Sequence, residues 1–416
     1  MGLMAFLPVL GLYVQERFGI ADARELASWT SLIYGAAPLA AAIAGPIWGA
    51  LGDRTGKKPM AIRANLAIAL TTAAMPLMPT PMSLLLMRVV QGVLAGYVAP
   101  AMALVSQHMP SRLQGRVIAR LQVAMATGTF VGPYIGAEVT HWWGRSALFW
   151  VASLLSALAA LQLHLLAREE RPAAAGRGSF LGDFARASFG LVRQPVFGGL
   201  LVLLMVLRLG QNMLEPLVAF LVRDLGAFAP LAEVSATPQL ALDRTVAVAF
   251  GMLAVGQWIF TPWWGRMADR YGPLRCLGFL ALGLAGLFTL LTQVASTGWF
   301  LVLRGVFACL MAGSMTLAYA AASKRVAPAN RTLAFAMVQS CIQFGLAIGP
   351  MLGVAVAGGG SGGGADAELA FGRLFATAAS LCGFAGIGML TLRSLTTPRG
   401  AGDGGQARQA PPPPVA

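Results

Sequence analysis

A polar stretch that occurs twice limits what this chain can fold into more than any other feature. The first copy, Gly49–Lys58, joins two long apolar segments, and a degenerate second copy runs from Gly265 to Arg275. Asp53 of the first copy recurs as Asp269, 216 positions later. This period is far too long for a solenoid of stacked repeats, so it indicates two related halves.

Two further features keep this register. At the offset of 216, Arg88 falls on Arg304. At an offset of 217, Gly128 falls on Gly345, and the two segments share a pattern of small residues and proline. The other matched pairs are Gly132 with Gly349, Pro133 with Pro350 and Gly136 with Gly353. The sequence therefore predicts an internal duplication of the kind that membrane transporters build from parallel repeats.

Composition places both halves in a membrane. Of the 416 residues, 57% are hydrophobic and only 11% are charged, whereas a soluble domain has about 25% charged residues. The net charge of +14 lies between apolar segments, where it fits loops that face anionic lipid better than a nucleic-acid surface. The cysteines and histidines have no metal-ligand spacing, and no nucleotide-binding loop or catalytic triad is present. We therefore expect no cofactor, no metal site, no nucleic-acid partner and no enzymatic activity.

Twelve apolar segments, six in each half, predict an all-α integral membrane protein with two pseudo-symmetric six-helix bundles. The first segment, Met1–Val14, is shorter than the ~20 residues that cross a bilayer. We expect a short or truncated first helix whose true start lies upstream of Met1. The expected regions are an N-terminal bundle at 1–167, a cytoplasmic linker at 168–195, a C-terminal bundle at 196–393 and a disordered tail at 394–416.

The distribution of Lys and Arg predicts the orientation of the chain. Of the 30 such residues, 21 lie in loops on the side of Gly52–Pro59, including the linker and the tail. Six lie in the opposite loops and three lie inside spans. Because cytoplasmic loops carry the excess of Lys and Arg, we place the linker and both termini in the cytoplasm. The expected location is the cell membrane, specifically a bacterial inner membrane.

Several motifs resemble those of the major facilitator superfamily. Gly49–Lys58 resembles the loop between helices 2 and 3 of that family, and Leu86–Gly92 resembles its helix 4 motif. Gly128–Gly136 resembles the helix 5 motif of its proton-driven exporters, although Ala137 stands where a second glycine often follows. Together with Phe6–Pro8, these motifs are similar to the MdtG-like multidrug efflux branch of drug:H⁺ antiporters. The resemblance implies a major facilitator fold and a transporter rather than an enzyme.

The repeated loop is a candidate cytoplasmic gate. Asp53 lies at a helix end, and an acid there does not help to set the orientation of the chain in the membrane. We therefore expect its charge to have a cation or a helix N-terminus as partner. The resemblance implies that this partner is the start of helix 11, near 330–332, and that Asp269 meets the start of helix 5, near 115–117. A solvated turn acid is the alternative. The candidate gate residues are Gly49, Gly52, Asp53, Arg54, Gly56, Lys57 and Lys58, with Gly265, Asp269, Arg270, Gly272 and Arg275 in the second copy.

Charged residues inside spans are candidates for proton coupling. Arg88 must face the protein interior, where it either controls coupling with Gln91, as the resemblance implies, or caps carbonyl groups of neighbouring helices. In helix 7, Arg208 and Glu215 are seven positions apart and share one face. Burial raises the pKa of a carboxyl group and a nearby cation lowers it, so such a group can titrate in a useful pH range. Glu215 is therefore a suitable proton carrier. The alternative is a structural ion pair between Glu215 and Arg208.

Two further groups complete the candidate sites. Small residues four apart on helix 5 allow close helix packing, and the resemblance implies a hinge against helix 8; they are Gly128, Gly132, Pro133 and Gly136. Polar, aromatic and methionine side chains are candidates for the substrate cavity; they are Gln211, Asn212, Tyr97, Met311, Met315 and Tyr319.

The expected function is proton-coupled export of drugs or small amphipathic compounds by alternating access, carried out by a monomer in the lipid membrane. The expected partners are a small-molecule substrate and protons. One alternative is a transporter of a polar metabolite or sugar on the same fold, which converging amide side chains would favour. A membrane receptor or scaffold without transport activity is the alternative from another class.

Overall fold

The computed structural model describes residues 6–95, 127–128, 131–166, 186, 189–326, 331–358 and 370–394. For positions 8, 46–47, 49–50, 52–55, 57, 331–333, 336 and 393–394 it describes the backbone alone. None of the described residues forms a strand. Nine helices of the described part are long and apolar enough to cross a membrane. This confirms the predicted all-α membrane fold.

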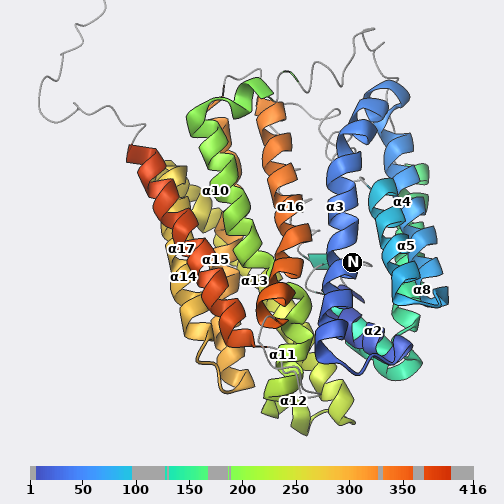
Figure 1. Ribbon diagram of the computed structural model, residues 1–416. Helices are drawn as coiled ribbons and strands as arrows, with labels where there is room; N and C mark the ends of the chain where they lie inside the picture. Colours follow the sequence, from blue (N-terminus) through green and yellow to red (C-terminus); the bar gives the residue numbers. More distant parts are fainter. Residues whose placement is uncertain are drawn as a thin grey trace, which may run out of the picture.

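The helices form two groups that meet along α3 and α16 (Figure 1). The first group contains η1 (Leu7–Val9), α2 (Leu10–Phe18), α3 (Ala23–Thr55), α4 (Lys57–Ala74), η2 (Met75–Leu77), α5 (Pro81–Leu94), the helical residues 131–143 and α8 (Ala147–Leu166). The second group contains α10 (Pro195–Asn212), η3 (Glu215–Leu217), α11 (Val218–Leu225), α12 (Ala229–Glu233), α13 (Pro238–Tyr271), α14 (Pro273–Leu291), α15 (Thr297–Ser323), α16 (Arg331–Gly358) and α17 (Phe371–Ser394).

The ends of corresponding helices keep the register of 216 residues. Helices α3 and α13 both end one residue before a glycine with positive φ, which is 104° at Gly56 and 87° at Gly272. Thr80 caps α5 and Ser296 caps α15. Each cap accepts a hydrogen bond from the backbone N–H three residues later, at 3.1 and 3.3 Å. The duplication therefore extends to the ends of α3 and α13 and to the starts of α5 and α15.

Hydrogen bonds between helices are duplicated as well. Trp48 Nε1 donates to the carbonyl of Val93 and so joins α3 to α5. Trp264 Nε1 donates to the carbonyl of Cys309 at 2.9 Å and joins α13 to α15. Both partners in the second bond lie 216 positions after their counterparts in the first. The two halves thus share side-chain contacts in addition to the order of their helices.

Helix 7 departs from the single span that the sequence predicts. Helix α10 ends at Asn212, and η3 and α11 continue the chain after a short irregular stretch. Pro216 lies in η3, where its missing N–H is compatible with the interrupted hydrogen-bond ladder. The same order, a 3₁₀ turn with a proline followed by a short α-helix, occurs in η1 and α2, where the proline is Pro8. The order of a proline-containing 3₁₀ turn and a short α-helix is therefore common to both halves.

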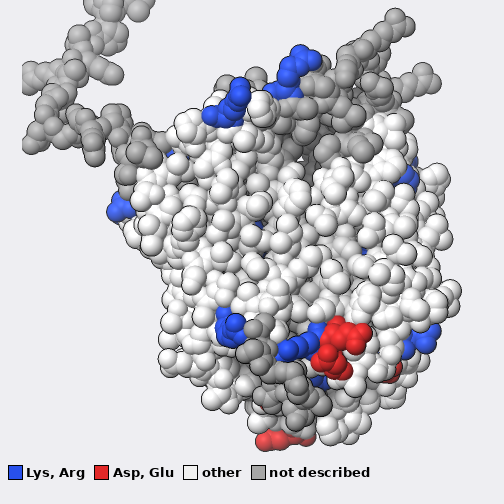
Figure 2. Space-filling model, in the orientation of Figure 1, with Lys and Arg blue, Asp and Glu red and all other residues white. Residues whose placement is uncertain are grey.

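The two ends of the helix bundle carry different charges. We call the end where α3 meets α4 and α13 meets α14 the motif end, and the end with α2, α11 and α12 the far end (Figure 1). On the face drawn in Figure 2, the acidic side chains gather at the far end, whereas Lys and Arg occur at both ends. On this face the motif end shows Lys and Arg without acids, although Asp269 of the repeated loop is also exposed at that end.

The glycine between α13 and α14 gives a test of the fold. A Cβ at Gly272 would meet no atom within 4 Å, so the cost of Gly272→Ala comes from its backbone conformation (φ +87°) alone. We expect the free energy of unfolding in detergent to fall by about 1–3 kcal/mol. Gly265→Ala is the matched control, because Gly265 also lies in open space but within α13. That variant should be neutral or gain up to about 1 kcal/mol, and an equal loss in both would contradict the argument.

Candidate functional site

Arg88 is buried in α5 and bonds to the backbone of α3. Its Nε donates to the carbonyl of Ile33 at 3.0 Å, and its Nη2 donates to the carbonyl of Tyr34 at 3.4 Å. Nη1 donates to Gln91 Oε1, and the Gln91 amide donates to Thr72 Oγ1 at 2.8 Å. These contacts are those of an arginine that caps carbonyl groups and ties α5 to α3 and α4. A role in proton coupling stays a prediction.

Arg304 repeats this arrangement in the second half and adds an ion pair. Its Nε donates to the carbonyl of Ala249 at 3.2 Å, and Ala249 lies 216 positions after Ile33. Its Nη2 donates to Glu215 Oε2 at 2.8 Å, with both side chains buried. The duplicated arginine therefore holds a carbonyl in each half but a carboxylate only in the second.

The surroundings of the two arginines explain this difference. At the offset of 216, Thr72 and Gln91 fall on Phe288 and Phe307. The polar pair of the first half is thus replaced by two aromatic rings, whose centroids are 5.8 Å apart. The Arg304 guanidinium lies 5.0 Å from the ring centroid of Phe307, a cation–π contact, but it has no amide to bond. Arg304 donates to the Glu215 carboxylate, where Arg88 donates to the Gln91 amide oxygen.

The ion pair that the sequence offered for Glu215 is wrong. Glu215 pairs with Arg304, and no ion pair between Arg208 and Glu215 occurs in the described part of the chain. The two residues would share a face only on an unbroken helix, and α10 ends between them. Glu215 lies in η3, which packs against α3 of the first half. Its Oε1 is buried and has no hydrogen-bond partner among the described residues.

The polar side chains of α10 bond to their neighbours. Asn212 Nδ2 donates to the carbonyl of Arg208 at 2.7 Å, and Gln211 Nε2 donates to Ser314 Oγ at 3.3 Å. Arg208 Nη1 lies 3.9 Å from the sulfur of Met311, which is a weak acceptor. These contacts connect α10 to α15 and engage both candidate amides.

Three candidate cavity residues form one stripe on α15. Met311, Met315 and Tyr319 recur four residues apart and are each half-buried. Tyr319 Oη donates to Gln339 Oε1 of α16 at 2.7 Å. The fourth candidate, Tyr97, lies outside the described residues. The stripe is apolar apart from this one hydroxyl.

The small-residue pattern of α16 packs inside its own half. A Cβ at Gly345, Gly349 or Gly353 would collide with α10 between Arg208 and Met213. Helix α16 contacts the first half through a different residue, Ala347, whose backbone lies against Gly35 of α3. The first-half pattern is buried, and its hinge role stays a prediction for Gly128, Gly132, Pro133 and Gly136.

The repeated loops lie at the motif end, and their partners are described only in part. Lys58 Nζ donates to the His164 carbonyl in the last turn of α8 at 2.9 Å, where a cation also suits the helix dipole. The side chain of Asp53 and the segments 115–117 and 328–330 lie outside the described part. Asp269 is exposed. Gly272 and Arg275 line an open groove, and the gating role of the loops stays a prediction.

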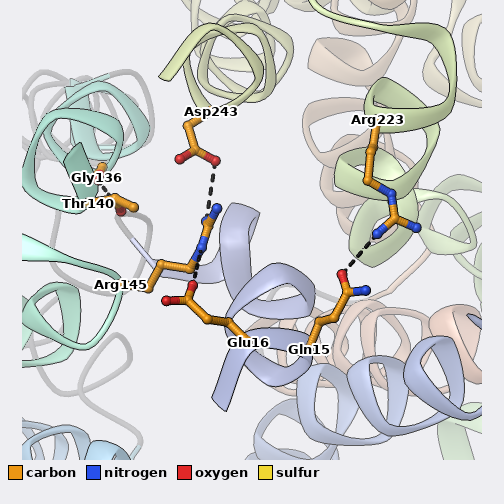
Figure 3. A network of polar contacts seen from close by, with 7 residues as sticks. All are labelled: Gln15, Glu16, Gly136, Thr140, Arg145, Arg223 and Asp243. Carbon is orange, nitrogen blue, oxygen red and sulfur yellow. Dashed lines mark hydrogen bonds and ion pairs between the residues drawn. The ribbon is translucent and has the colours of Figure 1, made fainter. Parts of the chain in front are cut away.

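Charged side chains link the two halves at the far end (Figure 3). Arg145, at the start of α8, donates to Glu16 Oε2 of α2 at 2.9 Å and to Asp243 Oδ1 of α13 at 3.3 Å. Arg223 of α11 donates to Gln15 Oε1 of α2 at 2.9 Å. Arg223 and Asp243 belong to the second half, and their partners Gln15 and Arg145 belong to the first.

A further ion pair crosses the same end. Arg244 of α13 donates through Nε and Nη2 to Glu138 Oε1, at 2.8 and 2.6 Å. From the sequence, Arg145, Arg223 and Arg244 count only among the six Lys and Arg residues of the opposite loops. A usable signal was available, because each half places both an acid and an arginine on this side of the membrane. The far end therefore holds a second candidate site, a set of links between the halves.

Comparisons with known proteins agree with this architecture. A family model described as Major Facilitator Superfamily matches residues 1–227 and again residues 200–416. The chain is 26% identical over 356 residues to the multi-drug resistance efflux pump PmrA homolog of Lactococcus lactis, which covers 85% of this chain and 84% of that protein. It is 26% identical over 358 residues to the multidrug resistance protein MdtG of Proteus mirabilis, with 86% and 85% covered. A crystal structure of the nucleoside transporter NupG is similar with a TM-score of 0.70 at 14% identity, covering 94% of this chain and 98% of that one.

The buried pair gives a prediction that also tests the corrected partner. In Glu215→Leu the Arg304 guanidinium stays buried without its counter-charge, so the free energy of unfolding should fall by about 3–5 kcal/mol. A double-mutant cycle with Arg304→Leu should give a coupling free energy of about 1–3 kcal/mol, measured by chemical unfolding in detergent. The same cycle with Arg208→Leu should give a value near zero. Coupling to position 208 instead of 304 would contradict the observed pairing.

Proposed function

Since the chain belongs to the major facilitator superfamily, a family of transporters and not of enzymes, we propose that it exports drugs or small amphipathic compounds in exchange for protons. The chain is a multi-pass membrane protein that moves small molecules. The relatives named as multidrug efflux or resistance proteins, similar over about 85% of the chain, support the substrate class. Antiport and the proton as the coupling ion are parts of the proposal.

The single observation that carries proton coupling is the Glu215–Arg304 pair. Ionisable residues inside a membrane span mark proton and substrate pathways. One carboxylate oxygen of Glu215 bonds to Arg304, and the other is buried with no hydrogen-bond partner among the described residues. Because η3 packs on α3, a change in the charge of Glu215 acts directly at the contact between the halves. Glu215 is thus the proposed proton carrier.

The polar contacts favour an amphipathic substrate over a sugar or another polar metabolite. A polar solute requires amide and hydroxyl groups that are free to bond to it. The described amides of Gln91, Gln211 and Asn212 are all bonded within the protein. The stripe of Met311, Met315 and Tyr319 offers an adaptable apolar surface instead. A transporter of polar metabolites on the same fold is therefore the second choice.

In this proposal the chain alternates between two states closed at opposite ends. The ion pairs of the far end close the outer side, and the repeated loops close the cytoplasmic side in the other state. The motif end faces the cytoplasm, with the linker 168–195 and both termini on that side, in a bacterial inner membrane. The two bundles, 1–167 and 196–393, move against each other in one monomer, and the proposed hinge is the helix that contains Gly128–Gly136.

A transport assay in inverted membrane vesicles tests the function. Hydrophobic fluorescent compounds should accumulate in vesicles with a proton gradient, and accumulation should stop when a protonophore removes the gradient. Glu215→Gln should abolish gradient-driven accumulation, because the side chain no longer carries a proton. Arg193→Gln, an exposed charge loss near the motif end, is the control. Accumulation that does not depend on the proton gradient would contradict antiport. If no compound accumulated, a receptor or scaffold without transport activity would be favoured.

The far-end links generate a separate prediction. Arg145→Gln leaves Asp243 buried without its counter-charge, so the state that is closed at the far end should lose stability. A cysteine at Ser31, a buried position on α3, reports opening in a background without the four native cysteines. We expect a membrane-impermeant maleimide, added from outside, to label this cysteine roughly tenfold faster or more, which corresponds to about 1.4 kcal/mol.

Arg17→Gln is the matched control for this labelling experiment. It removes the same charge from α2 at the far end, and Arg17 forms no ion pair among the described residues. Labelling should stay at the rate of the parent protein. Equal acceleration in both variants would mean that general charge, and not the pair of Arg145 with Asp243, keeps this end closed.

A further inference from the structure

Six charged side chains are buried among the described residues, each at most 6% exposed. They are Arg88, Arg145, Arg208, Glu215, Asp243 and Arg304. Five of them have partners that suit their charge. Arg304 pairs with Glu215, Arg145 pairs with Asp243, and Arg88 donates to two carbonyls and an amide oxygen. Arg208 is the exception.

Among the described residues, the guanidinium of Arg208 has no acceptor that matches its charge. Nη1 lies 3.9 Å from the sulfur of Met311, and Nη2 is buried without a hydrogen-bond partner in the described part of the chain. A buried charge without a partner is strongly unfavourable, and charges inside spans mark substrate pathways. A role in stabilising the fold therefore explains Arg208 poorly, whereas a role in binding an anion explains it well.

The neighbouring helices hold Arg208 toward α15. Gly345 allows α16 to pack against the Cβ and the backbone of Arg208 on one side. On the other side lie Met311 and, within electrostatic range, Tyr319. The two amides that follow Arg208 on α10 are bonded within the protein. Arg208 is thus the polar group of this region that is left for a ligand.

We propose that Arg208 binds the oxyanion of an amphipathic organic acid, whose apolar body contacts Met311, Met315 and Tyr319. A guanidinium offers two parallel N–H donors to a carboxylate or phosphonate, and methionine and aromatic side chains adapt to varied apolar groups. This inference rests on the proposed export function and narrows its substrates to organic anions rather than lipophilic cations.

A matched pair of probes tests the anion site. 1-Pyrenebutyrate and its methyl ester differ in the negative charge and in one methyl group, and their fluorescence reports binding to the purified full-length protein in detergent. The wild type should bind the acid about 10- to 100-fold more tightly than the ester, as expected for hydrogen bonds between charged groups. Arg208→Met should remove this preference and keep the affinity for the ester within about twofold. Arg193→Met, which loses an exposed charge, should keep the preference.

A structural role makes different predictions. If Arg208 only supported the fold, Arg208→Met would lower the melting temperature without ligand; we expect it to stay the same or rise, because an unpartnered charge is removed. Arg208→Lys keeps the charge but loses the planar fork, so it should show an intermediate preference for the acid. It also serves as the test variant if Arg208→Met fails to fold.

The outcomes separate this inference from the proposed export function. Equal binding of acid and ester by the wild type, or an unchanged preference in Arg208→Met, would overturn the anion site. The same holds for a lower melting temperature of Arg208→Met without ligand. In vesicles, export of the ester with no preference for the acid would overturn the anion site alone. Export of neither probe, nor of any other compound, would overturn the function on which it rests.

Discussion

A guanidinium group inside a membrane span needs acceptors within the protein, and the arginine repeated at 88 and 304 meets this need by joining helices. In each half its Nε bonds to a backbone carbonyl of the long helix that precedes it, at Ile33 or at Ala249. A helix interior has no free N–H groups, but its carbonyls have a second lone pair. The arginine can therefore fix α5 on α3, and α15 on α13, without breaking either helix. The repeated interaction thus gives the two halves one internal geometry.

The function resides where the halves differ. In the first half, Arg88 bonds to Gln91, and Gln91 bonds to Thr72, so the network is polar and closed. In the second half, two phenylalanines occupy the positions of the glutamine and the threonine, and the arginine must find another acceptor. Glu215 provides it from η3, at the contact with α3. Where one copy of the repeat has an amide, the other thus has a buried carboxylate at the seam, and this carboxylate is the proton carrier that we propose.

The sequence predicts the parts of this structure that local pattern and repetition determine. The offset of 216 identified Arg304, but not that Ala249 would accept its hydrogen bond. The alternative of an ion pair between Glu215 and Arg208 is wrong, because helical spacing assumes an unbroken helix and α10 ends before η3. Glu215 and Arg304 are 89 residues apart in the sequence, and a contact over that distance produces no periodic pattern in the sequence. The ion pairs of the far end are not predictable for the same reason, since Arg145 and Asp243 lie 98 residues apart in the sequence.

The two kinds of ion pair in this chain suit two different tasks. The pair of Arg304 with Glu215 is buried on both sides, so removing one partner is costly. At the far end, Arg244 and Glu138 have side chains that are 27% and 44% exposed, and pairs open to solvent contribute only about 0–1 kcal/mol. A closed state held by such pairs, with one buried pair at Arg145 and Asp243, is stable by only a few kcal/mol. A difference of this size can be reversed by a proton or a substrate that binds one state better, since about 5.5 kcal/mol carries a two-state equilibrium from 1:99 to 99:1. In the proposed cycle, one buried pair and one exposed pair at the far end would together set the stability of the state that is closed there.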